Sequence, residues 1–219
     1  MGVGNGSGSS TSKMRFLKIQ GLKQESKEVF LEMTEKQGDK YVSLGNYKNV
    51  SGRLHKLEVK DFEYTPPGAK ESKKGRSLKL YIVDDAEDTT YILDIGFHDM
   101  LTSLLNSIAS EELFEKIEIS VFVNKKGFKT IGVKLDGKET KWKYDFKELN
   151  AMKTKVMDPD DDTKVLLTKR NKLDDFLIKE IINPLIERLN GNASKSEFLQ
   201  GIPSTDSAVS KEEESDLPF

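Results

Sequence analysis

Residues 78–110 read LKLYIVDDAEDTTYILDIGFHDMLTSLLNSIAS, and their hydrophobic period changes once along the way. Residues 78–83 alternate apolar and polar side chains, and residues 89–95 do the same after an acidic turn. Such alternation is typical of a half-buried β-strand. From residue 97 to 110 the apolar side chains recur at helical spacing instead, and Asp99 is placed to cap that helix. The stretch therefore predicts two strands followed by a helix.

The sequence on either side of this stretch adds three more strands. Residues 51–64, SGRLHKLEVKDFEY, predict one long strand with a bend near His55, where the alternation slips. Residues 117–123 and 129–135 alternate on both sides of a glycine-containing turn. The order strand, strand, strand, helix, strand, strand is that of the OB-fold, a five-stranded Greek-key barrel. We expect a mainly β protein: an OB-type barrel with its helix between strands three and four, plus a C-terminal helix.

The flanking segments divide the chain into four parts. Residues 1–13 are rich in Gly and Ser and predict a disordered N-terminus, and residues 14–150 predict the OB domain with an N-terminal extension. Residues 151–190 predict an acidic loop and a helix from Asn171 that Pro184 kinks or breaks. Residues 191–219 predict a disordered acidic tail.

Composition narrows the class of protein. The chain is 36% hydrophobic and 33% charged, which suits a single folded domain with polar extensions. It has no uncharged apolar run of membrane-spanning length, no signal-peptide pattern and no cysteine. We therefore expect no membrane association and a reducing, cytoplasmic location. The acidity is concentrated in residues 204–219, which hold one Lys against five Asp and Glu.

Catalytic and metal-binding patterns are weak. His55 and His98 fall in different predicted elements, and neither belongs to a triad or metal signature. Residues 132–138 have the glycine and lysine spacing of a phosphate-binding loop, but Glu139 replaces the required Ser or Thr. The acidic run at 158–162 lacks the glycine and bidentate glutamate of a calcium loop. We expect no enzyme activity, no cofactor and no bound metal.

Lysines and aromatic residues interleave where an OB barrel exposes its binding loops and open face. Basic runs occupy the loop before residue 78 and the turn at residues 124–129. Lysines contact phosphates with little sequence preference, and aromatic rings stack on any base. The predicted nucleic-acid contacts are Arg53, Lys60, Phe62, Tyr64, Lys73, Lys74, Arg76, Lys79, Tyr81, Lys125, Lys126, Phe128, Trp142, Lys143 and Tyr144. For Trp142, Tyr144 and Phe146 a place in the core is an equal alternative.

The C-terminal residues KEEESDLPF resemble the acidic tip of bacterial and phage single-stranded DNA-binding proteins, which ends in Asp-hydrophobic-Pro-Phe. Asp216, Leu217, Pro218 and Phe219 match that pattern. Residues 50–144 also resemble phage proteins of this family in their pattern of strands and helix. The resemblance implies DNA binding in replication, recombination or repair, in the cytoplasm of a bacterium or of a phage-infected host. It also implies that the tip docks onto replication and recombination proteins. The N-terminal 50 residues and the helix from Asn171 depart from the bacterial family, which leaves its oligomeric state open.

The sequence therefore predicts a non-enzymatic protein that binds single-stranded DNA with little sequence preference. It leaves RNA binding, the size of the binding site and the identity of the partners open. One alternative is an OB-type protein-interaction or adaptor module that binds no nucleic acid. A third, less favoured reading is a metal-dependent nuclease that uses the E-x-K pair Glu58 and Lys60.

Overall fold

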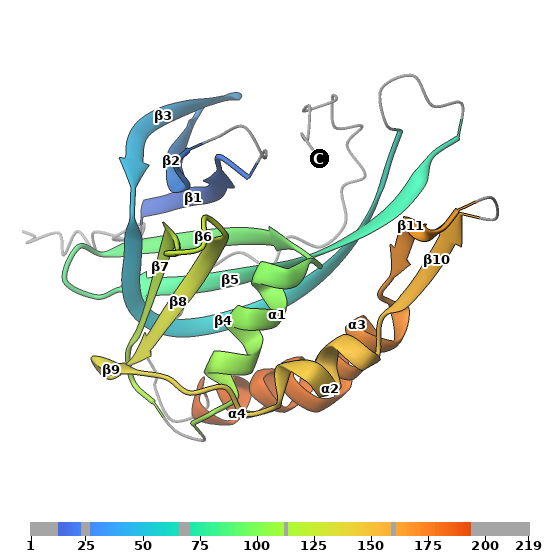
Figure 1. Ribbon diagram of the computed structural model, residues 1–219. Coiled ribbons are helices and arrows are strands. Elements are labelled where there is room, and N and C mark those ends of the chain that lie inside the picture. Colours follow the sequence, from blue (N-terminus) through green and yellow to red (C-terminus); the bar gives the residue numbers. More distant parts are fainter. Residues whose placement is uncertain (1–12, 23–26, 66–70, 112–113, 159–160, 194–219) are drawn as a thin grey trace, which may run out of the picture.

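The computed structural model describes residues 13–22, 27–65, 71–111, 114–158 and 161–193 (Figure 1). Its strands are β1 (Lys13–Gln20), β2 (Phe30–Gln37), β3 (Lys40–Tyr47), β4 (Asn49–Tyr64), β5 (Lys73–Asp84), β6 (Thr89–Gly96), β7 (Ile117–Val123), β8 (Lys129–Leu135), β9 (Lys138–Glu139), β10 (Thr154–Asp158) and β11 (Asp161–Lys169). Its helices are α1 (Asp99–Ile108), α2 (Phe146–Ala151), α3 (Asn171–Leu177), the π-helical η1 (Ile178–Ile182) and α4 (Asn183–Ala193).

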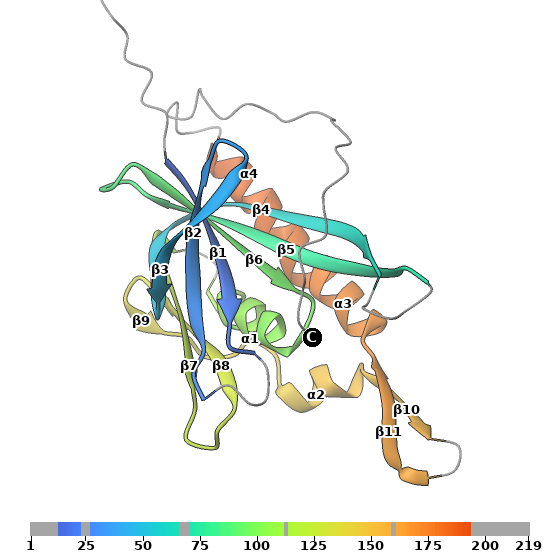
Figure 2. The ribbon, with the colours of Figure 1, turned by 90° about the horizontal axis from the view of Figure 1, so that it is seen from above.

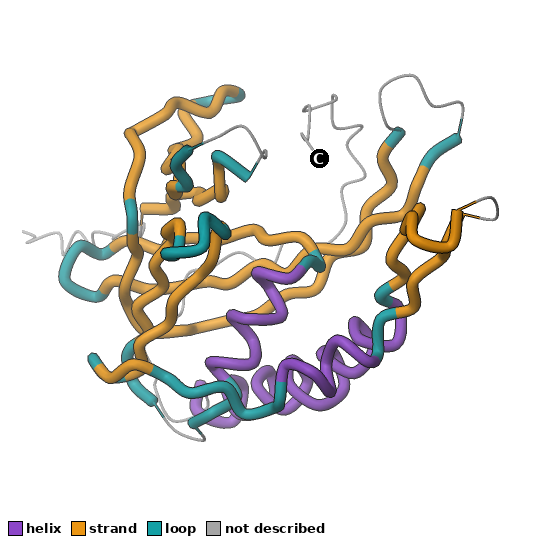
Figure 3. Tube along the Cα trace, in the orientation of Figure 1, coloured by secondary structure: helices purple, strands orange, loops and turns teal. Residues whose placement is uncertain are grey.

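The described chain is mainly β, as expected. Nine strands form one mixed sheet in the order β3-β2-β1-β6-β5-β4-β7-β8-β9, and β10 pairs separately with β11. Neighbouring strands of the nine-stranded sheet are antiparallel except β1 and β6, which run parallel. The helices lie along one side of β4, β5 and β6 (Figures 1 and 3).

The expected five-stranded closed barrel is wrong. Its five strands and central helix are present as β4, β5, β6, α1, β7 and β8. Closing that barrel requires the free edge of β6 to meet β8, but β1 occupies this edge, in a register from Lys13 opposite Thr89 to Lys18 opposite Asp94. The segment treated as an extension therefore supplies three strands of the sheet. They are held there because Leu17, Leu31 and Met33 are buried in the shared core.

Strand β4 belongs to both halves of the sheet. Its residues 49–52 pair with β7, and residues 53–64 pair with β5. The register shifts between Leu54 and Lys56, which confirms the bend expected at His55. At Gly52 a Cβ atom would lie 2.4 Å from the carbonyl oxygen of Val83, so only glycine allows this close approach of β4 to β5. The bend folds the sheet around a single core.

Helix α1 fills that core, as predicted. Leu101, Leu104, Leu105 and Ile108 are each 0% exposed. Its cap is His98 and not Asp99: His98 Nδ1 accepts a hydrogen bond from the backbone N–H of Met100 at 3.3 Å. Burial lowers the pKa of His98, which favours the neutral ring that can accept this bond.

The C-terminal helix continues through Pro184 instead of breaking there. Proline has no N–H to donate to the preceding turn, and its ring crowds the carbonyl four residues earlier. The turn before it is therefore π-helical, and the Asn183 N–H donates to the carbonyl oxygen of Ile178 five residues back. This wider turn keeps one face of the helix against the core, with Leu173, Leu177, Ile181, Ile182 and Leu185 buried.

The expected acidic loop at 151–170 is corrected to a hairpin. Strands β10 and β11 pair antiparallel from Thr154 opposite Lys169, and the hairpin projects away from the sheet (Figure 2). The predicted N-terminal segment up to residue 12 and the tail beyond residue 193, with its four-residue tip, lie outside the described residues. Within the described part of the chain, no helix combines the length and apolar character needed to cross a membrane.

Candidate nucleic-acid interface

The sheet from β3 to β4 has an outer face opposite the core. In β1, the buried residues Leu17 and Ile19 alternate with Phe16, Lys18 and Gln20, so the last three side chains point outward. On the other strands, the residues paired with these three in register point to the same outer face. Phe16 and Tyr41 meet edge to face, with ring centres 5.2 Å apart. The aromatic members of the outer face are Phe16, Phe30, Tyr41, Phe62, Tyr64 and Tyr81.

A row of charged side chains crosses the middle of this face. In register order from β2 to β4 it runs Glu32, Lys18, Asp94, Lys79, Glu58. The two lysines thus alternate with three acids, and Lys79 Nζ lies 3.9 Å from Asp94 Oδ2. Lys79 was predicted to contact phosphate, but its charge is already partly balanced by the protein.

Tyr81 lies beside this row in a small cluster. Its hydroxyl donates to Glu58 Oε2 at 2.8 Å, and Lys56 Nζ lies 5.2 Å from its ring centre. Burial and the hydrogen bond to Glu58 raise the pKa of Tyr81 far above its ordinary value. The same hydrogen bond lowers the pKa of Glu58. Tyr81 is therefore neutral at physiological pH and held in one orientation.

The far ends of β4 and β5 form a long arm that carries several predicted contacts (Figure 1). Phe62 lies opposite Gly75, where a Cβ atom would come within 2.5 Å of its ring, and the ring centre of Tyr64 is 5.9 Å away. Lys60 and Lys73 are exposed and form no ion pair with other described residues. Phe62 and Tyr64 thus form an aromatic surface with two exposed lysines beside it, of which Lys60 also interacts electrostatically with Glu58.

Lys74, Arg76 and Arg53 are more engaged with the protein. Lys74 Nζ is 3.9 Å from Glu63 Oε1, but its side chain is 88% exposed. Arg53 donates to Asp85 Oδ1 at 3.1 Å. Strand alternation turns Lys74 and Arg76 away from the outer-face aromatics. Arg53 lies opposite Val83, two residues from Tyr81 along β5, and is therefore on the outer side, but Asp85 already balances its charge.

Arg76 points to the helical side of the sheet, with buried Leu78. Its Nε donates to Asp61 Oδ1 at 2.7 Å, and its guanidinium lies 5.8 Å from the Phe97 ring centre. The ion pair with Asp61 outweighs burial and raises the pKa of Arg76 further. Arg76 is therefore placed to hold the arm against the helices, away from the outer face.

The turn between β7 and β8 presents Lys125, Lys126 and Phe128. Asn124 Oδ1 accepts hydrogen bonds from the backbone N–H groups of Lys126 and Phe128, at 2.9 and 3.0 Å. This tight turn leaves the Phe128 side chain 66% exposed. In Figures 1 and 2 the turn lies well apart from the tip of the β4–β5 arm. The two basic loops flank the sheet without meeting.

The three aromatic residues after β9 divide between the two predicted roles. Tyr144 packs on Phe176 with ring centres 5.1 Å apart, and its backbone N–H and carbonyl both bond to the Asn106 side chain. Trp142 is 47% exposed and lies against Phe146 at 5.3 Å. Tyr144 is therefore structural, with Lys143 Nζ 5.6 Å from its ring centre, whereas Trp142 is free to contact a ligand.

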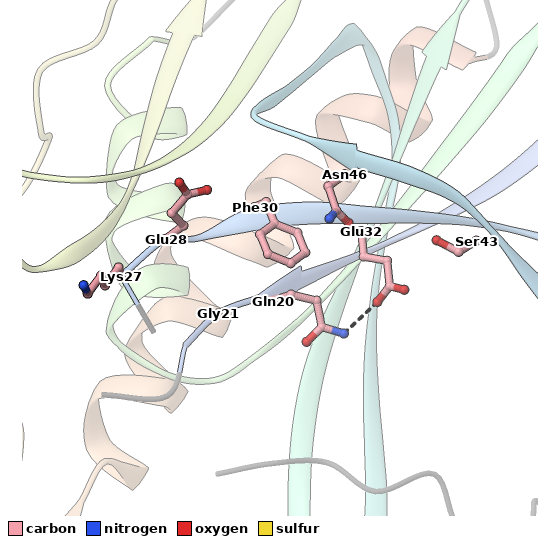
Figure 4. Close-up of a pocket in the computed structure, with 8 residues that line it drawn as sticks. All are labelled: Gln20, Gly21, Lys27, Glu28, Phe30, Glu32, Ser43 and Asn46. Carbon is pink, nitrogen blue, oxygen red and sulfur yellow. Dashed lines mark hydrogen bonds between the residues drawn. The ribbon is translucent and has the colours of Figure 1, made fainter. Parts of the chain in front are cut away.

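Phe30 borders a cavity of about 620 Å³ between β1, β2 and β3 (Figure 4). Gln20 Nε2 donates to Glu32 Oε2 at 2.7 Å on its wall, and Ser43 and Asn46 come from β3. The sequence analysis missed this site because residues 14–50 were treated as an extension. The alternation of Phe16, Lys18 and Gln20 was the available signal for it.

Neither a metal site nor a known relative adds to this picture. Among the described residues, no group of three or more His, Cys, Asp or Glu is placed to hold a metal ion. Glu58 of the E-x-K pair is instead engaged by Tyr81. Comparisons with family models, with curated proteins and with solved structures found no match.

Proposed function

We propose that the protein binds single-stranded nucleic acid, DNA above all, across the outer face of the sheet. The observation that carries the proposal is the set of aromatic side chains on this face, with lysines beside them. Most proteins bury such rings; here Phe16, Phe30, Phe62 and Tyr81 are only half-buried and Tyr41 is exposed at 59%. Stacking of bases on aromatic rings contributes about 1–3 kcal/mol per base and tolerates any base.

The charges on this face favour stacking as the larger contribution. The central row holds two lysines and three acids, so it attracts phosphate weakly. Free lysines lie at the margins instead, with Lys60 and Lys73 on the arm and Lys125 and Lys126 in the β7–β8 turn. A nucleic-acid strand with its bases over the sheet and its phosphates towards these margins would contact both the aromatic rings and the lysines.

The resemblance to single-stranded DNA-binding proteins supports the same function and adds a second part to the proposal. Residues 204–219 carry a balance of −4, one Lys against five acids. We propose that this segment competes weakly with nucleic acid for the marginal lysines and recruits replication or recombination proteins. Removing residues 211–219 should strengthen oligonucleotide binding at low salt, and the gain should vanish as salt screens the competition.

The test compares a thymine oligonucleotide with a duplex of equal length at two salt concentrations. The single strand should bind more tightly at both. Phe62→Ala should weaken binding by about 1–3 kcal/mol while the protein stays folded. Tyr47→Ala is the matched control, because Tyr47 is 41% exposed but lies opposite Leu31 on the core side of the sheet. Equal affinity for duplex and single strand would refute the proposal.

One observation favours the alternative of a protein-interaction module. Strand β3 is one of the two edge strands of the nine-stranded sheet and exposes Val42 at 41% and Leu44 at 37%. An apolar edge strand is a ready surface for pairing with a strand of another protein. If no oligonucleotide binds in the titration above, this reading replaces the first. Val42→Lys should then abolish capture of the partner.

A further inference from the structure

We propose that the cavity beside Phe30 is a nucleobase pocket that selects guanine within the bound strand. The inference rests on the proposed function, because it concerns one base of the same strand. It goes further by giving a largely sequence-tolerant surface one position that distinguishes bases. The residues that carry it are Gln20, Phe30, Glu32 and Asn46, which surround the same space in Figure 4.

The cavity is an open hollow with the volume of a small-ligand site. Its volume of about 620 Å³ falls within the range of about 300–1,000 Å³ found for such sites. Phe30 begins β2 between two buried residues, Val29 at 1% and Leu31 at 0% exposure, while its own ring is half-buried. A base stacked on this fixed ring would gain affinity whatever its identity.

Selectivity comes from the polar wall. Glu32 Oε2 accepts the hydrogen bond from Gln20 Nε2 at 2.7 Å, which orients the carboxylate. Glu32 forms no ion pair with another described residue, so its second oxygen remains available as an acceptor. An ionised carboxylate can only accept hydrogen bonds. The pocket therefore favours a base edge that presents donors.

Guanine is the base whose Watson–Crick edge presents two adjacent donors, N1–H and the N2 amino group. These match the two oxygens of a carboxylate in a bidentate, charge-assisted pair, in which Glu32 Oε2 accepts from the base with its second lone pair while it still accepts from Gln20. Adenine, cytosine and thymine each place a ring or carbonyl acceptor next to their donor, and that acceptor would face the carboxylate. Asn46 is the cross-strand neighbour of Glu32, so its side-chain amide lies beside the carboxylate, on the side where it can donate to guanine O6, the atom next to N1–H on the same edge.

The remaining charges at the rim fit a bound nucleotide. Lys27 is exposed and available to a phosphate, whereas Glu28 is paired with Lys48 at 3.5 Å. Lys48 Nζ also donates to the carbonyl oxygen of Val29 at 3.0 Å. Lys48 therefore balances the charge of Glu28, which would otherwise repel a phosphate.

The experiment measures competition against a labelled oligonucleotide of about 12 thymines. The competitors are the same thymine strand with one central guanine, adenine, cytosine or hypoxanthine. The guanine strand should bind about tenfold more tightly than the all-thymine strand. Hypoxanthine, which lacks the N2 amino group, should lose most of this gain. This comparison needs no protein variant and therefore cannot fail through misfolding.

Protein variants locate the preference. Glu32→Gln should abolish the guanine preference, measured as the ratio of the guanine-strand affinity to the all-thymine affinity of the same variant. Glu35→Gln is the matched control, since it removes the same charge from the same strand on the opposite face. A guanine preference that survives Glu32→Gln, or equal binding of all competitors, would overturn the pocket while leaving the proposed function intact. Failure of every strand to bind would instead overturn the proposed function.

Discussion

The four free lysines at the margins of the outer face should set the salt dependence of binding. Lys60, Lys73, Lys125 and Lys126 are exposed and form no ion pair with other described residues. Each phosphate contact to a single strand contributes about −0.7 to the slope of log K against log salt, so four contacts contribute about −2.8. Raising salt from about 50 to 200 mM should then weaken wild-type binding roughly 50-fold.

Replacing these four lysines by alanine should remove most of that slope and weaken all sequences alike. Fluorescence anisotropy of a labelled thymine oligonucleotide at five or so salt concentrations measures the slope directly. Lys134→Ala is the control, because Lys134 already lies 3.4 Å from Glu118 and should leave the slope unchanged. If the quadruple variant keeps the wild-type slope, the phosphates do not follow these margins and the proposed path of the strand is wrong.

Three further predictions concern the residues around α1. Asn106 is 1% exposed, and Asn106→Ala removes both of its hydrogen bonds to the Tyr144 backbone, at 2.8 and 2.9 Å. Urea denaturation should show that the free energy of unfolding falls by about 2–3 kcal/mol. Oligonucleotide should quench the fluorescence of Trp142, and Trp142→Ala should change the melting temperature little; no quenching with a large loss of stability would place Trp142 in the structural set. Burial alone would raise the pKa of Asp99, but hydrogen bonds and charges from Lys153 and Arg170 lower this pKa overall. The ionised carboxylate therefore stabilises the fold at pH values above its ordinary pKa, and this stabilisation is lost as the pH falls towards the pKa of the folded state. Asp99→Asn should reduce the acid sensitivity of the melting temperature below about pH 4, and an unchanged pH profile would contradict this.

The local spacing of apolar residues was sufficient to predict β4, β5, β6, α1, β7 and β8. The alternation of Leu78, Leu80 and Ile82 identified a strand whose inward side chains are all 0% exposed. The slip at His55 identified the bulge of β4, because an extra residue reverses the side-chain alternation at that point. The helical spacing of Leu101, Leu104 and Ile108 likewise reports which side meets the core.

Other features depend on contacts between residues that are distant along the chain, and the sequence alone did not predict them. Charged residues interrupt the apolar–polar alternation of β10 and β11, so the pairing of these strands, with Thr154 opposite Lys169, was not expected. The face taken by Arg76 follows from β5 beginning at Lys73, earlier than the predicted strand. Tyr144 is structural and Trp142 is not, because the Asn106 side chain, 38 residues away along the chain, binds the backbone of Tyr144.

For β4, β5, β6, α1, β7 and β8 the sequence by itself determined the kind of each element, their order, and which side chains face the core, because side-chain periodicity is a property of the local backbone. Only the tertiary structure decided which strand lies beside β6. Met14 to Lys18 take the edge that a five-stranded barrel would give to β8, a choice between segments about 115 residues apart. Backbone hydrogen bonds are nearly the same for either partner, so the buried side chains of β1 and β2 decide between them. That choice also brings Phe30 and Glu32 onto the outer face beside Gln20 and creates the pocket proposed to bind guanine.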